Sequence, residues 1–305
     1  MCKAHIRHAA KITLAVLFMF ISAASTGAEE AGEKYRLKYL FSTDAKTTGY
    51  KLRGIVGMYI DETAKELYIL DGGNRRVVIM DIEGTPLYNF RIPQDKDISF
   101  SCIVVDKLGR ILIAGGKSIA IFDYRGEFKG FIDLSGIPDN ETLMIQSVDV
   151  DSRNHIYIGS SGVDARIIEL DENGKFISQI KAEGKFVNVN SLNVFNGYTF
   201  LDAGNFRIIR LNESGEVTVK FGVLSSLLGG LSMPSGLALD RTNDRIIVVD
   251  TNRMKAILFN RDGKALYEFG GPQMFRWPRA IAVDRQGHIY VGDGSDSIRV
   301  FEVVE

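Results

Sequence analysis

The segment Pro234-Ser-Gly-Leu-Ala-Leu-Asp240-Arg-Thr-Asn-Asp-Arg245-Ile-Ile-Val-Val-Asp250 carries two short apolar runs joined by a polar turn. Such a pair of runs is typical of two antiparallel strands. The residue that opens the turn recurs six times along the chain, at separations of 45, 45, 45, 44 and 44 residues. The six copies are Asp61, Asp106, Asp151, Asn196, Asp240 and Asp284. This regular spacing is an internal repeat, so each period should form the same small antiparallel sheet.

Each period contains two more apolar runs after the first pair. In the fifth period these are 256–260 and 266–269, with Gly263 in the hairpin between them. Four strands in a period of about 45 residues are typical of one β-propeller blade. We therefore expect an all-β, six-bladed β-propeller of four-stranded antiparallel blades. The expected blades cover residues 54–90, 100–133, 145–180, 190–221, 234–269 and 278–303.

The sixth period ends after three strands, because the chain stops at Glu305. The missing strand must come from elsewhere, and residues 35–41 alternate apolar Tyr35, Leu37, Tyr39 and Phe41 with Arg36 and Lys38. We expect residues 35–41 to close the ring as the outer strand of the last blade. Closure of this kind removes the exposed sheet edges that favour aggregation.

The N-terminus has the features of an export signal. Basic residues precede an apolar run from Ile12 to Ala24, and small residues follow before Glu29. The run is short for a membrane span, so we interpret residues 1–28 as a cleaved signal peptide and 29–305 as one propeller domain. A retained membrane anchor is the alternative. The chain is expected in the periplasm or outside the cell, with no stable membrane span after cleavage.

The charge balance disfavours nucleic-acid binding. The whole chain has 37 basic and 38 acidic side chains, and removal of Lys3, Arg7 and Lys11 with the signal leaves 34 against 38, a net charge of −4. Nucleic-acid binding needs a dominant basic field. Cys102 is the one cysteine left after cleavage, so no internal disulfide is expected.

A motif of Asp, two small residues and Asn ahead of a basic residue recurs in the repeats. It reads Asp71-Gly-Gly-Asn74-Arg-Arg76 and Asp202-Ala-Gly-Asn205-Phe-Arg207, and the last period adds Pro278-Arg-Ala-Ile-Ala-Val-Asp284. On these motifs the chain, from about Tyr35 to Val303, resembles the NHL-repeat family of six-bladed propellers, in an exported bacterial form. The resemblance implies the fold and leaves the function open.

The repeats also carry acidic and basic residues five positions apart. The pairs are Asp71 with Arg76, Asp202 with Arg207, and Asp250 with Lys255. We interpret them as structural pairs that hold the second and third strands of a blade together. The alternative is a ring of charges that binds an anionic or zwitterionic partner.

No residue set identifies a catalytic group, and the metal ligands, if any, are unknown. His155 and His288 occupy equivalent turns three blades apart, so they cannot share one metal ion. This disfavours a zinc site such as that of the related amidating lyase, and we interpret both histidines as turn residues. No cofactor is predicted, with calcium as the ion to consider.

Two inner strands break the apolar pattern. The third period has Asp149 between two valines, and the fourth has Asn193 between Leu192 and Val194. A carboxylate and an amide on neighbouring blades near the axis would form a polar site, able to take calcium or a substrate as in gluconolactonase-type propellers. The alternative is a buried hydrogen-bonded pair or a water-filled channel.

Two connections between blades are unusually apolar. The first contains Leu227 and Leu228, and the second contains Phe275, Arg276, Trp277 and Arg279. We expect these six residues to form a partner-binding surface, because Trp and Arg often dominate binding energy. The alternative is that the loops plug the channel.

The combined prediction is an exported, non-catalytic binding or scaffolding propeller. Its partner would be a protein or peptide of the cell envelope, and a monomer is expected. The alternative is a metal-dependent hydrolase or lyase of the gluconolactonase or amidating-lyase kind, using calcium or zinc. A sugar-binding propeller that stacks its ligand on Tyr50, Tyr59 or Trp277 is a third hypothesis.

Overall fold

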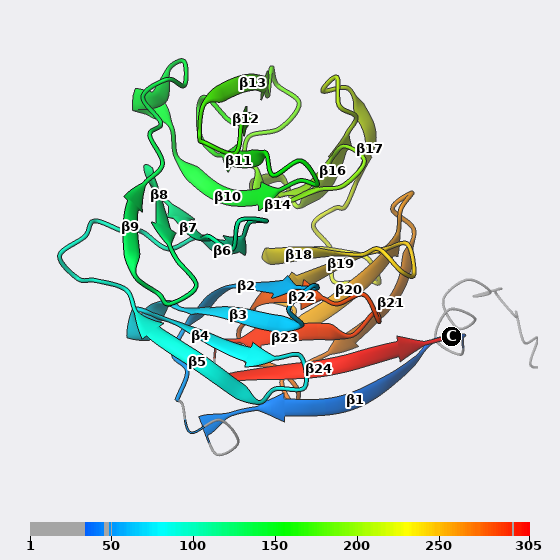
Figure 1. The fold of residues 1–305 in the computed structure, drawn as a ribbon. Helices are drawn as coiled ribbons and strands as arrows, with labels where there is room; N and C mark the ends of the chain where they lie inside the picture. The colour runs from blue at the N-terminus through cyan, green and yellow to red at the C-terminus, as the bar shows by residue number, and fades with distance from the viewer. Residues whose placement is uncertain (1–33, 46–48, 50, 295) are drawn as a thin grey trace, which may run out of the picture.

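A computed structural model describes residues 34–45, 49, 51–294 and 296–305 of the chain. The described residues form six four-stranded antiparallel sheets arranged around an axis as the blades of a propeller (Figure 1). The predicted all-β, six-bladed fold is confirmed. The predicted signal peptide and Tyr50 lie outside the described residues. Within the described residues, no helix has the length and apolar character needed to cross a membrane.

Each blade runs from an inner strand at the axis to an outer strand at the rim, in chain order for the first five blades. Blade 1 has β2 (Ile55–Asp61), β3 (Glu66–Asp71), β4 (Arg76–Asp81) and β5 (Pro86–Arg91); blade 2 has β6 (Cys102–Val105), β7 (Ile111–Gly115), β8 (Ser118–Phe122) and β9 (Phe128–Phe131); blade 3 has β10 (Ile145–Val150), β11 (Ile156–Ser160), β12 (Arg166–Leu170) and β13 (Phe176–Lys181). Blade 4 has β14 (Asn190–Val194), β15 (Tyr198–Asp202), β16 (Arg207–Leu211) and β17 (Val217–Phe221); blade 5 has β18 (Pro234–Asp240), β19 (Arg245–Asp250), β20 (Lys255–Asn260) and β21 (Ala265–Gly270).

Blade 6 is built from both ends of the described chain. Its strands are β22 (Pro278–Val283), β23 (Ile289–Asp293), β24 (Ser297–Val304) and, on the outside, β1 (Arg36–Thr43). Figure 1 shows β1 lying antiparallel along β24, with Leu37 opposite Val303 and Tyr39 opposite Phe301. The predicted closure of the ring by an N-terminal outer strand is confirmed.

The side-chain alternation within β1 differs from the expected one. A shift of register between Tyr39 and Phe41 inserts an extra residue opposite β24. Leu40, the inserted residue, and Phe41 after it both pack against the core between blades 6 and 1, while Tyr39 is 55% exposed. A bulge places two residues opposite one and so interrupts the two-residue period of a strand.

The core consists of apolar layers between neighbouring blades. Strands β3, β7, β11, β15, β19 and β23 lie second from the axis, and nearly every side chain in them is buried. Both faces of these strands contact another blade, which explains their continuous apolar sequence. Outer strands such as β5 face solvent on part of their surface and carry more exposed residues.

The repeated acidic residue caps the turn between the first and second strands. Asp61 Oδ1 accepts hydrogen bonds from the backbone N–H groups of Thr63 and Ala64, at 2.8 and 3.0 Å. The same capping occurs at four other copies, Asp106, Asp151, Asp240 and Asp284. At the remaining copy, the fourth in the chain, Asn196 has a positive φ of 51° and begins a tighter turn with Gly197. The repeated residue that predicts the fold therefore stabilises the turn between the first two strands of a blade.

Candidate functional site

A cavity of about 1430 Å³ lies at the centre of the ring. It is lined by the inner strands β2, β6, β10, β14, β18 and β22 and by residues of the hairpins that follow them. Figure 1 shows these six strands facing one another around the axis. Because ligand sites are concave and combine apolar walls with a few polar groups, this cavity is the candidate functional site.

Polar side chains of one inner strand bond the backbone of the next inner strand across the cavity wall. Asp149 Oδ2 accepts from the backbone N–H of Val194 at 2.7 Å, linking blade 3 to blade 4. Ser191 Oγ accepts from the backbone N–H of Leu237 at 2.8 Å and so links blade 4 to blade 5. These bonds satisfy backbone groups at the free edge of each blade, which would otherwise be left without a partner.

The predicted pair, Asp149 and Asn193, do not bond each other; each bonds the backbone of the blade that follows its own. Asn193 Nδ2 donates to the backbone oxygen of Leu237 at 3.3 Å, whereas Asp149 bonds Val194. Both residues line the cavity, as predicted, but their recorded bonds go to the backbone of the following blade. Ser191 was missed by the sequence analysis, although it also interrupts an apolar strand and could have been found by the same rule.

Burial raises the pKa values of two acidic groups in the cavity wall, the Asp149 carboxyl and the Cys102 thiol. Desolvation raises the pKa of Asp149 to about 6, and it is opposed by the N–H groups of Val194 and Val150 and by the positive charge of Arg241. Burial also raises the pKa of the Cys102 thiol to about 12. This thiol accepts a hydrogen bond from the Val148 N–H at 3.1 Å, so it is a neutral structural group at physiological pH.

Two further cavity residues face Asp149 from other blades. Burial raises the pKa of the Tyr59 phenol on β2, and the charge of Asp149 is the next cause. Arg241 follows β18, and its guanidinium lies 4.6 Å from the ring centroid of Phe195. No sequence pattern marks Arg241, because its place beside Asp149 and Tyr59 depends on three blades converging on one space.

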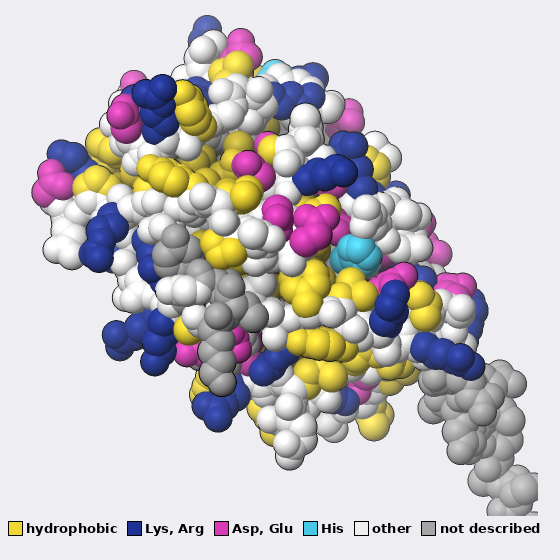
Figure 2. Space-filling view, turned by 60° about the horizontal axis from the view of Figure 1, so that its bottom comes forward, with side chains coloured by type: hydrophobic (Ala, Val, Ile, Leu, Met, Phe, Trp, Pro, Cys, Tyr) yellow, Lys and Arg dark blue, Asp and Glu magenta, His cyan; other side chains and the backbone are white. Residues whose placement is uncertain are grey.

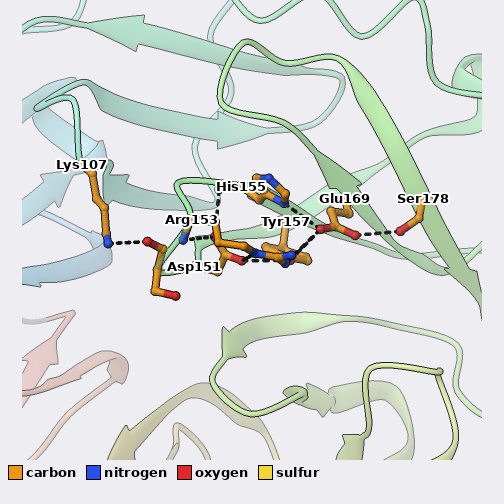
Figure 3. Close-up of polar contacts among 8 residues, drawn as sticks. Lys107, Asp151, Arg153, His155, Tyr157, Glu169 and Ser178 are labelled. Atoms are coloured by element: carbon orange, nitrogen blue, oxygen red, sulfur yellow. Dashed lines mark hydrogen bonds and ion pairs between the residues drawn. The ribbon is translucent and has the colours of Figure 1, made fainter.

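A network of polar side chains occupies the edge of the cavity in blade 3 (Figure 3). Glu169 is its centre and accepts hydrogen bonds from Tyr157 Oη at 2.9 Å and Ser178 Oγ at 2.9 Å, while His155 Nδ1 lies 2.8 Å from Oε1. Burial alone would raise the pKa of Glu169, but these hydrogen bonds lower it below its usual value. The network therefore favours an ionised Glu169.

The same network reaches the turn after β10 and the neighbouring blade. Arg153 Nε binds Asp151 Oδ2 at 2.9 Å, and Lys107 of blade 2 donates to the backbone oxygen of Ser152 (Figure 3). Each charged group in this network has a partner of opposite charge or a carbonyl oxygen. We therefore interpret the network as a brace between blades 2 and 3.

The two histidines are turn residues, as predicted. The backbone N–H groups of His155 and His288 donate to Asp151 and Asp284, at 2.9 and 2.8 Å. They belong to blades 3 and 6. Among the described residues, no group of three or more His, Cys, Asp or Glu side chains has the arrangement of a metal site. Whether calcium binds remains a prediction.

Two of the three predicted structural pairs form. Asp71 Oδ2 lies 2.7 Å from Arg76 Nε, and Asp202 Oδ2 lies 3.7 Å from Arg207 Nη2. In both, the acidic residue ends the second strand and the basic residue begins the third, which agrees with the structural interpretation.

The third predicted pair, Asp250 with Lys255, is wrong. Lys255 pairs with Glu268 on the adjacent strand β21. Asp250 instead accepts from the backbone N–H groups of Ser232 and Met233, at 2.6 and 3.0 Å. The reason is that the preceding loop presents two N–H groups to Asp250, while Glu268 lies beside Lys255 in the sheet.

The predicted partner surface is only partly at the surface. Leu227 and Trp277 are 75% and 58% exposed, and Leu228, Arg276 and Arg279 are also exposed. Phe275 is completely buried, so its assignment as a contact residue is wrong. Its ring packs against Phe269 and Phe301 between blades 5 and 6.

The two loops that carry the exposed residues of that surface are each held by contacts with a blade. The loop that carries Leu227 and Leu228 is bonded to Arg253 of blade 5. Trp277 packs over Gly294 of blade 6. The backbone N–H of Trp277 is held by Asp293 at 2.7 Å.

The whole fold is similar to several solved propellers. A streptogramin B lyase matches with a TM-score of 0.59 and 14% identity, over 90% of this chain and 99% of that chain. A luciferin-regenerating enzyme matches with a TM-score of 0.63 and 13% identity, over 89% and 95%. A WD40 β-propeller domain matches with a TM-score of 0.57 and 15% identity, over 81% and 78%. These likenesses show the propeller fold alone.

Comparison of the sequence itself finds no matching family model and no matching curated protein. The NHL-repeat resemblance therefore remains a prediction. The six-bladed propeller fold that it implies is confirmed.

Replacement of Asp149 provides a test of the protonation of the cavity wall. Because the folded-state pKa of this carboxyl lies above its unfolded value, the folded chain binds the proton more tightly, and this contribution to stability is lost as the pH rises from about 4 through about 6. The groups that face Asp149 are Arg241, Tyr59, Cys102 and Asp151. Asp149→Asn keeps an acceptor for the Val194 N–H and removes the buried charge.

We expect Asp149→Asn to raise the free energy of unfolding at pH 7.5 by roughly 1–2 kcal/mol, since cavity water screens part of the effect. The gain should shrink towards zero near pH 4. Urea unfolding of both chains at pH 4, 5, 6 and 7.5 measures this difference. Parallel stability curves for the two chains across that range would contradict the assignment.

Proposed function

We propose that this chain is an exported, non-catalytic binding propeller that takes a protein or peptide partner in the periplasm or at the cell surface. The observation that carries the proposal is the loop between blades 4 and 5, residues 222–233. It combines a fixed backbone with a set of apolar side chains exposed to solvent. Such ordered apolar patches on a monomer mark interaction sites.

Hydrogen bonds fix this loop in one conformation. The Leu231 N–H donates to the Val223 oxygen at 2.9 Å, and the Gly230 N–H donates to the Leu227 oxygen at 2.9 Å. Leu231 itself is completely buried and anchors the loop. Arg253 Nη2 donates to the Ser226 oxygen at 2.9 Å. The loop therefore needs little ordering when a partner binds, which reduces the entropic cost of association.

Four apolar side chains stand out from this fixed loop. Val223, Leu224 and Leu227 are 64%, 60% and 75% exposed, and Leu228 is 41% exposed. Burying a side chain of this kind contributes about 1.5–3 kcal/mol. Trp277, with Arg276 and Arg279, offers a second anchor of the residue types that dominate protein interfaces.

The surface charge supports a protein partner over a nucleic acid. The face in Figure 2 carries Lys and Arg side chains interspersed with Asp and Glu, with apolar side chains between them. The formal net charge of the whole sequence is −1. A surface without a dominant basic field gives little affinity for a phosphate backbone.

Site-specific crosslinking tests the proposal. A photoreactive amino acid at position 227 is expected to capture a defined protein in the native envelope fraction, and the same group at Leu108, a 62% exposed leucine in a turn of blade 2, is expected not to. With that protein purified, Leu227→Ser should weaken binding about tenfold, and Leu108→Ser should leave the dissociation constant unchanged. Equal loss in both variants, or capture at position 108 alone, would overturn the assignment of the loop.

A metal-dependent hydrolase or lyase is the second candidate. It is supported by the likeness to a streptogramin B lyase and by the central cavity with Asp149 in its wall. Elemental analysis of protein from the native source tests it, together with calcium titration of the parent chain and of Asp149→Ala. A stoichiometric divalent ion that Asp149→Ala loses would support the enzyme. Absence of calcium binding in the parent chain would count against calcium at this position.

A further inference from the structure

Two charged groups in the wall of the central cavity, the carboxylate of Asp149 and the guanidinium of Arg241, lie on different blades and form no ion pair within the described part of the chain. Other charged lining residues without an ion pair to a described residue are Asp61, Glu62, Lys107, Glu213, Arg279 and Arg285. Among the described residues, neither Asp149 nor Arg241 forms an ion pair with any charged side chain, including each other. Both line the cavity and lie close enough for the charge of Arg241 to act on Asp149. The buried carboxylate of Asp149 is costly without a charged partner, so it favours a ligand cation. The guanidinium of Arg241 is exposed at the cavity and can accept a ligand anion.

The repeat explains how these groups come to face one space. Tyr59 and Asp149 each stand two residues before the capping Asp of their own blade, so they lie at the same depth of the ring in blades 1 and 3. Blades 5 and 6 place Ala238 and Ala282 at this depth. Both alanines line the cavity, and Ala282 of blade 6 belongs to the blade across the ring from Asp149 of blade 3.

Arg241 stands one residue beyond the capping Asp of blade 5, towards the end of the cavity. Its guanidinium is held against the Phe195 ring of blade 4 at 4.6 Å. Stacking on an aromatic ring fixes the plane of a guanidinium and leaves its N–H groups free for a bidentate contact with a carboxylate.

Tyr59 supplies a third polar group. Its hydroxyl has no hydrogen-bond partner recorded within the described part of the chain, and its ring packs partly buried against the cores on either side of blade 2. A phenol can donate to a ligand oxygen.

From these contacts we propose that the central cavity binds a small zwitterion of the amino-acid class. The ligand carboxylate contacts the guanidinium of Arg241 and the hydroxyl of Tyr59, and the ligand ammonium contacts the carboxylate of Asp149. The two protein charges belong to different blades and do not pair, so a molecule that carries both opposite charges satisfies both at once. The remaining cavity volume accommodates the ligand side chain.

This inference is independent of the partner-binding loop. Residues 222–233 do not line the cavity, and Leu227 contributes nothing to its wall. Failure of the crosslinking experiment at position 227 and failure of amino-acid binding are therefore separate results.

The test uses the standard amino acids as probes. Each is titrated against the full mature chain at pH 7.5 and followed by isothermal calorimetry, and any amino acid that binds is compared with its N-acetyl derivative and its carboxamide. We expect at least one amino acid to bind and both derivatives to bind about tenfold more weakly or worse, since each loses one charged contact.

Variants assign each contact. Asp149→Asn should abolish the preference for the free amine over the N-acetyl form, and Arg241→Gln should abolish the preference for the carboxylate over the carboxamide. Arg261→Gln is the matched control, because Arg261 also lies over the Phe195 ring, at 5.5 Å, but is paired with Asp244 and does not line the cavity. It should bind like the parent chain.

Three results would overturn the proposal. In the first, no amino acid binds. In the second, the N-acetyl and carboxamide derivatives bind as tightly as the free amino acid. In the third, Arg241→Gln binds the amino acid as tightly as the parent chain does. Arg241 is exposed and Asp149→Asn is expected to be stable, so loss of binding in either variant can be separated from unfolding by its melting curve.

Discussion

A chain that lacks residues 29–42 is expected to melt about 10–20 °C below the full chain. The deletion removes nearly all of β1, the outer strand of blade 6, whose partner β24 would become a free edge. It also uncovers Phe301 and Val303, which are buried in the full chain. Each large apolar side chain that returns to water costs about 1.5–3 kcal/mol, so several together approach the whole stability of a domain.

Thermal unfolding followed by circular dichroism measures this loss. Addition of a synthetic peptide of residues 34–44 provides the control, because a strand supplied in trans should restore part of the melting temperature if the loss comes from the missing strand. A truncated chain that melts with the full chain would show that blade 6 is stable with three strands. The ring closure would then contribute little to stability.

Phe275→Ala is expected to lower the free energy of unfolding by about 3–5 kcal/mol, the usual cost of removing a buried phenylalanine. The Phe275 ring is completely buried, with Phe301 at 5.8 Å and Phe269 at 6.2 Å between ring centroids. The loss of this ring would leave a cavity between blades 5 and 6. Chemical unfolding measures the change.

Trp277→Ala is the matched control for Phe275→Ala. Trp277 lies two residues further along the same loop and is 58% exposed, so its replacement should cost less than about 1 kcal/mol. If Phe275→Ala were as mild as Trp277→Ala, the burial of Phe275 would be refuted, and Phe275 would again be available to a partner.

Local pattern alone predicted the strands and the turns. The apolar runs around Asp61 and its equivalents specified both the period and the turns, because a strand, a capped turn and a second strand are encoded within about fifteen adjacent residues. The incomplete last period also predicted that residues near Tyr35 close the ring. These features depend on neighbours in the chain or on a count of repeats, and both can be read from a sequence.

The orientation of individual loop side chains could not be predicted in this way. Phe275 and Trp277 occur in the same apolar loop, yet one ring is buried and the other is exposed. The backbone N–H of Phe275 bonds the oxygen of Gly271, which forms a turn beside the gap between two blades. Which ring enters that gap depends on the shape of both blades. The pairing of Lys255 with Glu268, in place of Asp250, has the same kind of cause.

The sequence by itself determined the number of blades, the strands in each, the closure of the ring and the presence of polar residues at Asp149 and Asn193 near the axis. Tertiary structure alone decided what those polar residues contact and which residues join them. Asp149 bonds the backbone of the next blade, and Tyr59 and Arg241 reach the same cavity from blades 1 and 5. The physical reason is that repeat spacing fixes depth along the axis, whereas contact across the cavity requires the ring to close.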